Sequence, residues 1–282
     1  MTRSFLRSIP ALILTAGLFA QDPKIQLPKL SPTGTVKQSV GLTTIEIVYS
    51  RPGVKGREIF GKMIPFGSVW STGANESTKI SLSTPVKLNG TEVPAGTYAL
   101  YTIPGASEWT IIVYKDPTLW GAYGYDQKND LFRIPAKPVK LAEPVETFTI
   151  DINDIRNESA TLNLIWEKTR VPVKLEFEST NKALAQIEAA MAAPGPKSGG
   201  FYYSALEFCL VNNVALTKAA AWADQGVVQN PKSGWVVYLK ACILAKLGDK
   251  PGAVAAARLS AEADKADSEL VQASGRLIDS LK

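Results

Sequence analysis

The stretch VPAGTYALYTIPGASEWTIIVYKD, residues 93–116, decides the fold class. Its two apolar runs, TYALYTI and WTIIVYK, place β-branched or aromatic residues at alternate positions, which is the period of a strand with one buried face. Turn signals accompany them, because Pro94-Ala95-Gly96 precedes the first run and Pro104-Gly105 separates the two. The stretch therefore predicts two neighbouring strands.

The same alternation extends on both sides, from about residue 34 to residue 178. It recurs in TTIEIVYS, TKISLS, ETFTIDI, ATLNLIWE and VPVKLEFE, and Asn89-Gly90 is a strong signal for a two-residue hairpin. Roughly nine or ten strands fit this pattern, with no helix-length pattern between them. Short strands at short intervals are typical of an antiparallel β-sandwich and disfavour a doubly wound α/β fold. We predict a β-sandwich domain over residues 31–178.

An alanine-rich helical pattern begins abruptly at residue 179. Ser179 or Thr180 is a suitable N-cap, and the first helix should end before Pro194-Gly195-Pro196. Beyond this break the residues repeat with an offset of 34, which is the period of tetratricopeptide-like helical hairpins. The matching pairs are Phe201 and Trp235, Leu210 and Leu244, Ala219 and Ala253, Ala221 and Ala255, and Ala223 and Ala257. We predict a small α-helical, tetratricopeptide-like domain over residues 179–282. Since two repeats are too few to stand alone, it should dock on the sandwich or on a protein partner.

The first twenty residues predict a secretory signal peptide. Arg3 and Arg7 supply the basic start, residues 9–20 form the apolar run, and the small residue Ala20 precedes Gln21. This run is too short to span a bilayer comfortably, and no later stretch is apolar for about eighteen residues. We therefore expect cleavage of residues 1–20 and export of the mature protein to the periplasm or the extracellular space, with no membrane span.

The absence of histidine excludes more chemistry than any other feature of the composition. Ser-His-Asp and Cys-His catalytic arrangements and His-ligated zinc or iron sites cannot be built. Without the two signal-peptide arginines, 29 basic residues (31 − 2) face 26 acidic ones, which disfavours nucleic acid as a partner. No motif indicates a cofactor or a metal site. Cys209 and Cys242 lie in apolar helical patterns, which favours buried thiols over a disulfide.

A basic loop, YSRPGVKGREIFG at residues 49–61, is the first candidate binding site. Arg51 and Arg57 carry the guanidinium fork that binds carboxylate, sulfate or phosphate groups, and Lys55 adds positive charge between them. An anionic ligand would suit this loop. The alternative is that the arginines pair with Glu58, Glu76 or backbone carbonyls and so brace the loop from inside.

A second candidate segment is FGSVWSTGANEST, residues 66–78. Asn75 and Glu76 follow a glycine turn and lead into a strand, where a scaffold edge presents polar groups to a ligand. Trp70 is either a stacking platform for a sugar or the plug of the sandwich core, and the plug is the interpretation that we favour for it.

A third candidate segment is LWGAYGYDQKND, residues 119–130. Trp120, Tyr123 and Tyr125 are interleaved with glycines, and glycine makes a segment costly to order. The segment is either the lip of a carbohydrate or peptide site or a self-packed loop.

Paired carboxylates provide a catalytic alternative. A hydrolase of polysaccharide or cell-wall material needs two carboxyl groups that face each other across the scissile bond. Glu76 with Asp126, or Glu76 with Asp130, is the pairing that these loops can supply. This hypothesis predicts that the pair faces one open cleft, about 5 to 9.5 Å apart.

Several long strings resemble a known family: YSRPGVKGREIFG, VWSTGANEST, VPAGTYALYTIPG with EWTIIVYKD, and WGAYGYDQKNDLFR. They are similar to the secreted bacterial family called domain of unknown function 2911, over residues 31–178, whose members often carry a helical tetratricopeptide-like tail. The resemblance implies an exported domain and no particular activity. It also implies one shared constellation of loop residues: Arg51, Pro52, Gly56, Arg57, Trp70, Gly73, Asn75, Glu76 and Trp120.

These features predict an exported protein without enzymatic activity. Its β domain would be a ligand-binding or scaffold module with a polar-aromatic loop face for a glycan or an anionic ligand, and its helical tail would contact a protein. The carboxylate-dependent hydrolase is the alternative. A third hypothesis is structural, with the arginines as internal clamps and the helices as the acting part.

Overall fold

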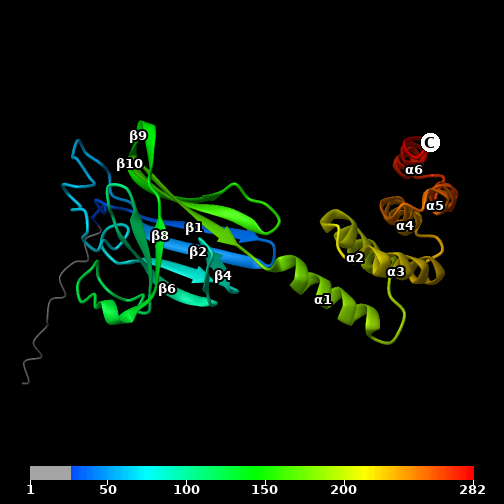
Figure 1. Cartoon of the computed structure of the whole chain (residues 1–282), viewed down its shortest axis with the longest axis horizontal. Helices are drawn as coiled ribbons and strands as arrows, with labels where there is room; N and C mark the ends of the chain where they lie inside the picture. The colour runs from blue at the N-terminus through cyan, green and yellow to red at the C-terminus, as the bar shows by residue number, and fades with distance from the viewer. Residues whose placement is uncertain (1–26) are drawn as a thin grey trace, which may run out of the picture.

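The computed structural model describes residues 27–282, which form two β-sheets followed by six α-helices (Figure 1). The predicted signal peptide, residues 1–20, lies outside the described residues. The strands are β1 (Thr33–Val40), β2 (Thr43–Ser50), β3 (Thr78–Leu82), β4 (Val86–Leu88), β5 (Thr91–Val93), β6 (Gly96–Ile103), β7 (Trp109–Tyr114), β8 (Asp130–Ala136), β9 (Val139–Asn153) and β10 (Ser159–Glu176).

Both sheets are antiparallel. The larger has six strands in the order β1-β2-β3-β6-β7-β8, and the smaller has four in the order β5-β4-β10-β9. Residues 93–116 supply the β6–β7 pair, in which Tyr101 lies opposite Ile112. Asn89 and Gly90 have φ values of 45° and 85°, the left-handed backbone that a two-residue hairpin between β4 and β5 requires. The predicted antiparallel β-rich fold is confirmed.

An aromatic core fills the space between the sheets. The Trp70 ring lies 5.1 Å from Phe148, 5.8 Å from Trp166 and 6.3 Å from Trp109, measured between ring centroids. Such ring pairs contribute about 0.5–1.5 kcal/mol each beyond the area that they bury. The alternation read from the sequence supplies this core, because every second residue of a strand faces the other sheet.

The opposite, outer face of the six-stranded sheet is aromatic in one region. Tyr101, Ile112 and Tyr114 form a second apolar cluster there, separate from the core between the sheets. Leu119 and Tyr125 pack against this cluster. They belong to residues 115–129, which we call the covering loop and which contain a 3-10 helix, η1 (Gln127–Asn129). The covering loop buries these outward-facing tyrosines.

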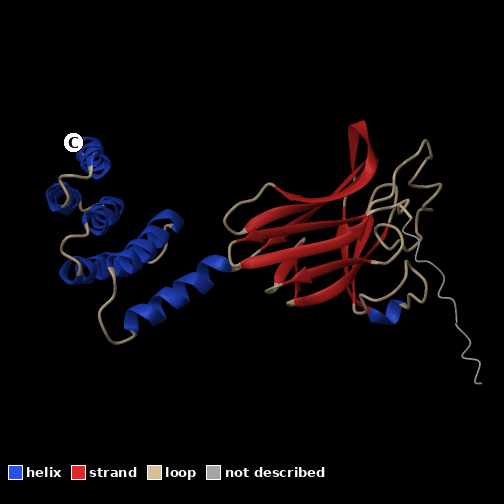
Figure 2. Ribbon diagram, turned by 180° about the vertical axis from the view of Figure 1, so that it is seen from behind, coloured by secondary structure: helices blue, strands red, loops and turns tan. Residues whose placement is uncertain are grey.

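The C-terminal region is helical, as predicted (Figure 2). Its helices are α1 (Ser179–Ala192), α2 (Gly199–Asn212), α3 (Leu216–Gln229), α4 (Gly234–Leu247), α5 (Lys250–Ala263) and α6 (Ser268–Ser280). Ala219 and Ala223 are fully buried against Leu206 and Cys209, since small side chains let helices approach closely. The tetratricopeptide-like repeat stays a prediction. No helix among residues 27–282 has the length and apolar character needed to cross a membrane.

Both cysteines are free thiols. Cys209 on α2 is buried and Cys242 on α4 is half-buried. Burial raises the pKa of both thiols above the usual value, because the thiolate loses hydration in an apolar environment. The thiols are therefore protonated at neutral pH and poorly nucleophilic.

Helix α1 continues directly from the smaller sheet and is anchored at its first turn. The Ser179 hydroxyl accepts a hydrogen bond from the Leu42 N–H at 3.1 Å, and the Glu158 carboxylate accepts one from the Thr180 N–H at 2.6 Å. Asn157 also donates to Asn212 on α2 at 3.1 Å. The helices thus extend beyond one end of the sheets, and the covering loop lies at the other end (Figures 1 and 2).

Candidate functional site

A cavity of about 340 Å³ opens on the outer face of the six-stranded sheet, next to the covering loop. Strands β1 and β2 and the residue just before β3 supply its floor, through Thr33, Val48, Ser50 and Ser77. Its walls come from residues 29–30, from residues 75–76 and from the covering loop. Four separate segments therefore meet at this cavity, which we call the outer-face cavity.

Trp120 forms the covering-loop wall of the outer-face cavity, and its side chain is 64% exposed. Its backbone is held firmly, because it forms an antiparallel bridge with Glu76 and its neighbour Gly121 accepts a hydrogen bond from the Tyr101 hydroxyl at 2.7 Å. The Ser77 N–H donates to the Leu119 carbonyl at 3.0 Å. The indole is thus a large apolar surface on a fixed backbone, available to a ligand.

Tyr123 and Tyr125 were predicted in the same candidate segment, but one is exposed and the other packs inward. Tyr123 is 89% exposed and does not line the outer-face cavity. Tyr125 points inward, with its ring 5.1 Å from Tyr114 and 5.3 Å from Tyr101. One segment therefore combines the two alternatives weighed from the sequence, a self-packed loop at Tyr125 and an exposed aromatic lip at Trp120.

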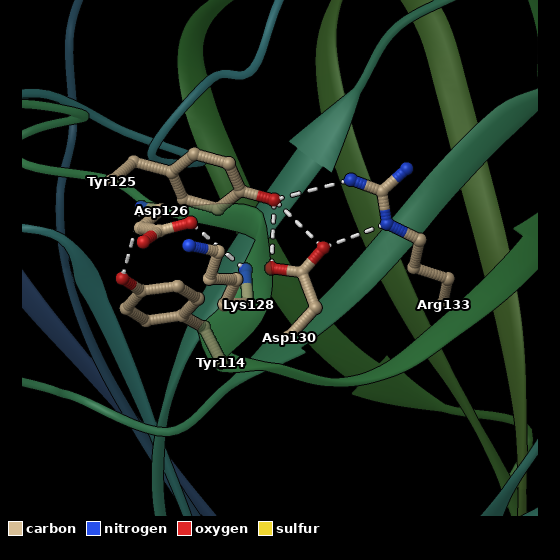
Figure 3. A network of polar contacts seen from close by, with 6 residues as sticks. All are labelled: Tyr114, Tyr125, Asp126, Lys128, Asp130 and Arg133. Atoms are coloured by element: carbon tan, nitrogen blue, oxygen red, sulfur yellow. Dashed lines mark hydrogen bonds and ion pairs between the residues drawn. The ribbon is translucent and has the colours of Figure 1, made fainter.

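A polar network fixes the covering loop to the sheet (Figure 3). The Tyr125 hydroxyl donates to Asp130, with the two carboxylate oxygens at 2.7 and 2.8 Å, and Arg133 Nε donates to the same carboxylate at 2.7 Å. Burial, followed by the hydrogen bond to Asp130, raises the pKa of Tyr125 to about 12. The Tyr114 hydroxyl accepts the Asp126 N–H at 3.2 Å. The network holds the loop that presents Trp120.

Asn75, Glu76 and Lys79 supply the polar rim of the outer-face cavity. Asn75 adopts a left-handed backbone, φ 60°, and its amide donates at 3.2 Å to the Ser31 carbonyl and at 3.2 Å to the Ser50 hydroxyl. These bonds tie the N-terminal segment to the rim. The Glu76 carboxylate is largely exposed and pairs with Lys79 at 3.4 Å. A ligand at the rim would meet a carboxylate and an ammonium group side by side.

The basic loop contributes only Tyr49 and Ser50 to the outer-face cavity, and Arg51, Lys55 and Arg57 lie outside its lining. Arg51 donates from Nε to the Phe148 carbonyl at 3.1 Å and from a terminal nitrogen to the Thr149 hydroxyl at 3.0 Å. Arg57 donates to the carbonyls of residues 53 and 54, at 2.7 and 3.0 Å. Lys55 is exposed and donates its backbone N–H to Glu146. These guanidinium groups brace backbone carbonyls, and the Glu76 partner considered from the sequence is paired with Lys79 instead.

Trp70 lies in the core rather than in a binding surface. It is 8% exposed, and its indole N–H donates to the Gly73 carbonyl at 2.9 Å. This satisfies the one polar group of a buried indole. The plug interpretation favoured from the sequence describes this placement.

The carboxylates of the hydrolase hypothesis are not gathered around the outer-face cavity. Glu76 lines it, whereas Asp126 caps η1 by accepting the Lys128 N–H at 3.0 Å. Asp130 is 6% exposed and engaged by Tyr125 and Arg133. The cavity therefore holds one of the two carboxyl groups that the paired mechanism needs.

Glu58 and Glu167 do share a cavity, of about 510 Å³, with Phe60 and Trp109 in its lining. Glu167 has a left-handed backbone, φ 52°, at a point where β10 shifts register against β9. Sequence reasoning missed this pair because a bulge inside a long strand leaves no turn signal. Within residues 27–282, no group of three or more acidic or cysteine side chains is placed to hold a metal ion.

Sequence reasoning also missed Ser77 and Lys79, which line the outer-face cavity directly after Glu76. Their alternate spacing places Ser77, just before β3, and Lys79, within β3, on the same side of the sheet. The pattern does not say which side of the sheet carries the cavity.

A family model described as protein of unknown function (DUF2911) matches residues 31–175, which is more than half of the chain. The chain belongs to this family. The DUF2911 match covers both sheets except the last residue of β10, Glu176, and stops before the helices. Of the cavity lining, it includes everything except residues 29–30. The DUF2911 description names no activity, and a comparison with curated proteins finds no match.

Proposed function

We propose that this chain is an exported, non-catalytic binding module that holds a saccharide in the outer-face cavity and contacts a protein through its helices. One observation carries the proposal. The exposed indole of Trp120 stands on a fixed backbone beside a cavity with a polar rim. Ligand sites are concave and largely apolar, with a few polar groups that set orientation, and this cavity has that composition.

A saccharide suits this combination of groups. One face of a sugar ring carries C–H groups that pack on an indole, while its hydroxyls need donors and acceptors around the edge. The rim supplies both kinds, because the Glu76 carboxylate accepts and the Lys79 ammonium donates. Binding without turnover is favoured over hydrolysis, since Glu76 is the one carboxylate that lines the cavity.

The proposed role of the helices rests on their exposed apolar residues. Val211, Val228, Leu247 and Leu259 are at least 44% exposed, and they come from α2, α3, α4 and α5. A contiguous apolar patch marks a protein contact, so the proposal requires that these side chains gather on one surface. Export rests on the predicted signal peptide.

The test is saccharide binding by the purified protein and by two variants. Isothermal titration calorimetry against cellohexaose, N-acetylchitohexaose and laminarihexaose should identify a ligand. Trp120→Ala should then weaken its binding roughly 10- to 100-fold, because an exposed aromatic anchor dominates a small site. Tyr123→Ala is the matched control, since Tyr123 is an exposed aromatic residue of the same loop outside the cavity lining.

Two results would contradict the proposal. Equal weakening by the two substitutions would mean that the outer-face cavity is not the site. Release of shorter saccharides during incubation with wild type would show turnover and favour the hydrolase.

A further inference from the structure

The Ser77 hydroxyl is an unusual feature of the outer-face cavity. Ser77 lines the cavity, is 2% exposed, and its hydroxyl oxygen has no hydrogen-bond partner among the described residues. A buried polar group without a partner costs about 1–3 kcal/mol, so native proteins leave few of them. Such a group at a candidate site is most simply explained by a partner that arrives with the ligand.

The neighbouring side chains do not supply that partner. Extending the strand registers places Ser77 opposite Ser50 on β2 and opposite Tyr101 on β6. The Ser50 hydroxyl accepts a hydrogen bond from Asn75 and the Tyr101 hydroxyl donates to Gly121. Each hydroxyl keeps further hydrogen-bonding capacity, but neither is a hydrogen-bond partner of Ser77. Burial raises the pKa of Tyr101 and the nearby Ser77 hydroxyl offsets part of that rise, but the two oxygens lack hydrogen-bond geometry. Ser77 therefore retains its capacity to donate and to accept.

The floor of the outer-face cavity is uncharged around Ser77. Thr33, Val48 and Ser50 surround it with hydroxyl and apolar groups. The charged rim residues Glu76 and Lys79 pair with each other. A third charged lining residue, Lys29, is exposed at the wall of the cavity, so a carboxylate or sulfate on the ligand would meet positive charge there but none on the floor, where a hydroxyl would meet the Ser77 oxygen. The floor thus favours a neutral group that both donates and accepts.

We infer that the outer-face cavity binds a neutral saccharide and that Ser77 is its specificity-determining contact, exchanging a hydrogen bond with one ring hydroxyl while the ring packs on Trp120. This inference rests on the proposed function. Because Ser77 is 2% exposed, the ligand needs a neighbouring lining side chain to move, and the Trp120 indole is more than half exposed and therefore not locked by packing. No covalent step is involved.

The Ser77→Ala substitution separates this role from a structural one. Removing a hydroxyl that has no partner should leave the melting temperature of the free protein unchanged or raised, because a desolvated group is lost without breaking a bond. Removing a ligand contact should weaken saccharide binding roughly 3- to 10-fold, the equivalent of one hydrogen bond. A merely structural serine would give the reverse pattern, a lower melting temperature with unchanged affinity.

Ser81→Ala is the matched control. Ser81 lies on the outer face of β3, four residues after Ser77, and it does not line the cavity. Its hydroxyl is paired with Thr97 at 2.9 Å. This substitution should leave the affinity unchanged. Both variants are titrated with the neutral hexasaccharide that binds wild type best, and wild type is also titrated with trigalacturonic acid as the acidic probe.

The outcomes distinguish the two proposals. No binding of any of these saccharides by wild type would overturn the proposed function and this inference together. Binding by wild type with equal affinity in Ser77→Ala would overturn the role of Ser77 and leave the proposed function standing. Tighter binding of trigalacturonic acid than of the neutral probes would overturn the neutral ligand class. The inference is supported by preference for a neutral probe, weakened binding by Ser77→Ala and unchanged binding by Ser81→Ala.

Discussion

Replacing Tyr125 by phenylalanine removes one hydroxyl from the network that holds the covering loop and leaves the ring in place. That hydroxyl donates to the buried Asp130 carboxylate at 2.7 Å, while the ring stays packed 5.1 Å from Tyr114. A hydrogen bond to a charged group contributes about 1.5–3 kcal/mol. Arg133 still pairs with Asp130 in the variant, so the carboxylate is not left alone. We expect the free energy of unfolding to fall by about 2 kcal/mol at pH 7.

The same hydrogen bond predicts a pH dependence. The pKa of Tyr125 is raised from its usual value of 10 to about 12, by burial first and then by Asp130. Since the unfolded chain releases this proton at lower pH than the folded protein, the stabilisation is complete below pH 10 and is lost as the pH rises through 12. At pH 11 the difference between wild type and Tyr125→Phe should be smaller than at pH 7 by about 1 kcal/mol.

Urea unfolding followed by tryptophan fluorescence, at pH 7 and at pH 11, measures both quantities. Tyr123→Phe is the control, because it removes an exposed hydroxyl from the same loop and should change the stability by less than about 0.5 kcal/mol. A Tyr125→Phe variant as stable as wild type at pH 7 would refute the predicted contribution of the Tyr125 hydroxyl. An equal stability difference between the two proteins at pH 7 and pH 11 would refute the predicted pH dependence.

Two further substitutions probe the core and the junction with the same unfolding assay. Trp70→Ala should cost about 3–5 kcal/mol, because it empties the centre of the aromatic core, whereas Trp120→Ala should cost less than about 0.5 kcal/mol. Equal costs would contradict the placement of Trp70 in the core. Gly41→Ala should cost roughly 2 kcal/mol, because φ is 55° and the added methyl would overlap the Ser179 hydroxyl. Adding Ser179→Ala should restore part of the loss, and no restoration would argue against a steric cause.

The arginine loop shows why a site is harder to predict than a fold. Arg51 and Arg57 have the same side chain and lie in one loop, yet their partners differ in origin. Arg57 braces carbonyls three and four residues away, which local sequence could suggest. Arg51 reaches residues 148 and 149, 97 and 98 positions along the chain. No pattern in the loop itself specifies a partner at that distance, so the choice between anion capture and internal clamp was open from the sequence.

The covering loop also shows that the role of a single residue is harder to predict than the fold. Its glycines and aromatic residues were visible, and a self-packed loop and a ligand lip were both reasonable. In the structure Tyr125 packs inward and Trp120 stays exposed, so one residue belongs to the self-packed loop and the other to the ligand lip. The difference arises because Tyr101 and Tyr114 offer an apolar surface at one position on the sheet, and Tyr125 is the residue that reaches it. Which aromatic residue turns inward depends on that surface.

Three features were predictable from the amino-acid sequence: the strand alternation, the hairpin at Asn89-Gly90 and the change to helix at residue 179. These are local properties, set by the side-chain period and by the backbone conformations that each residue accepts. Only the tertiary structure decided that Ser77 lies without a partner beside Trp120 and that one carboxylate lines their cavity. The physical reason is that a cavity is defined by the gap between surfaces, and here four segments from separate parts of the chain form those surfaces.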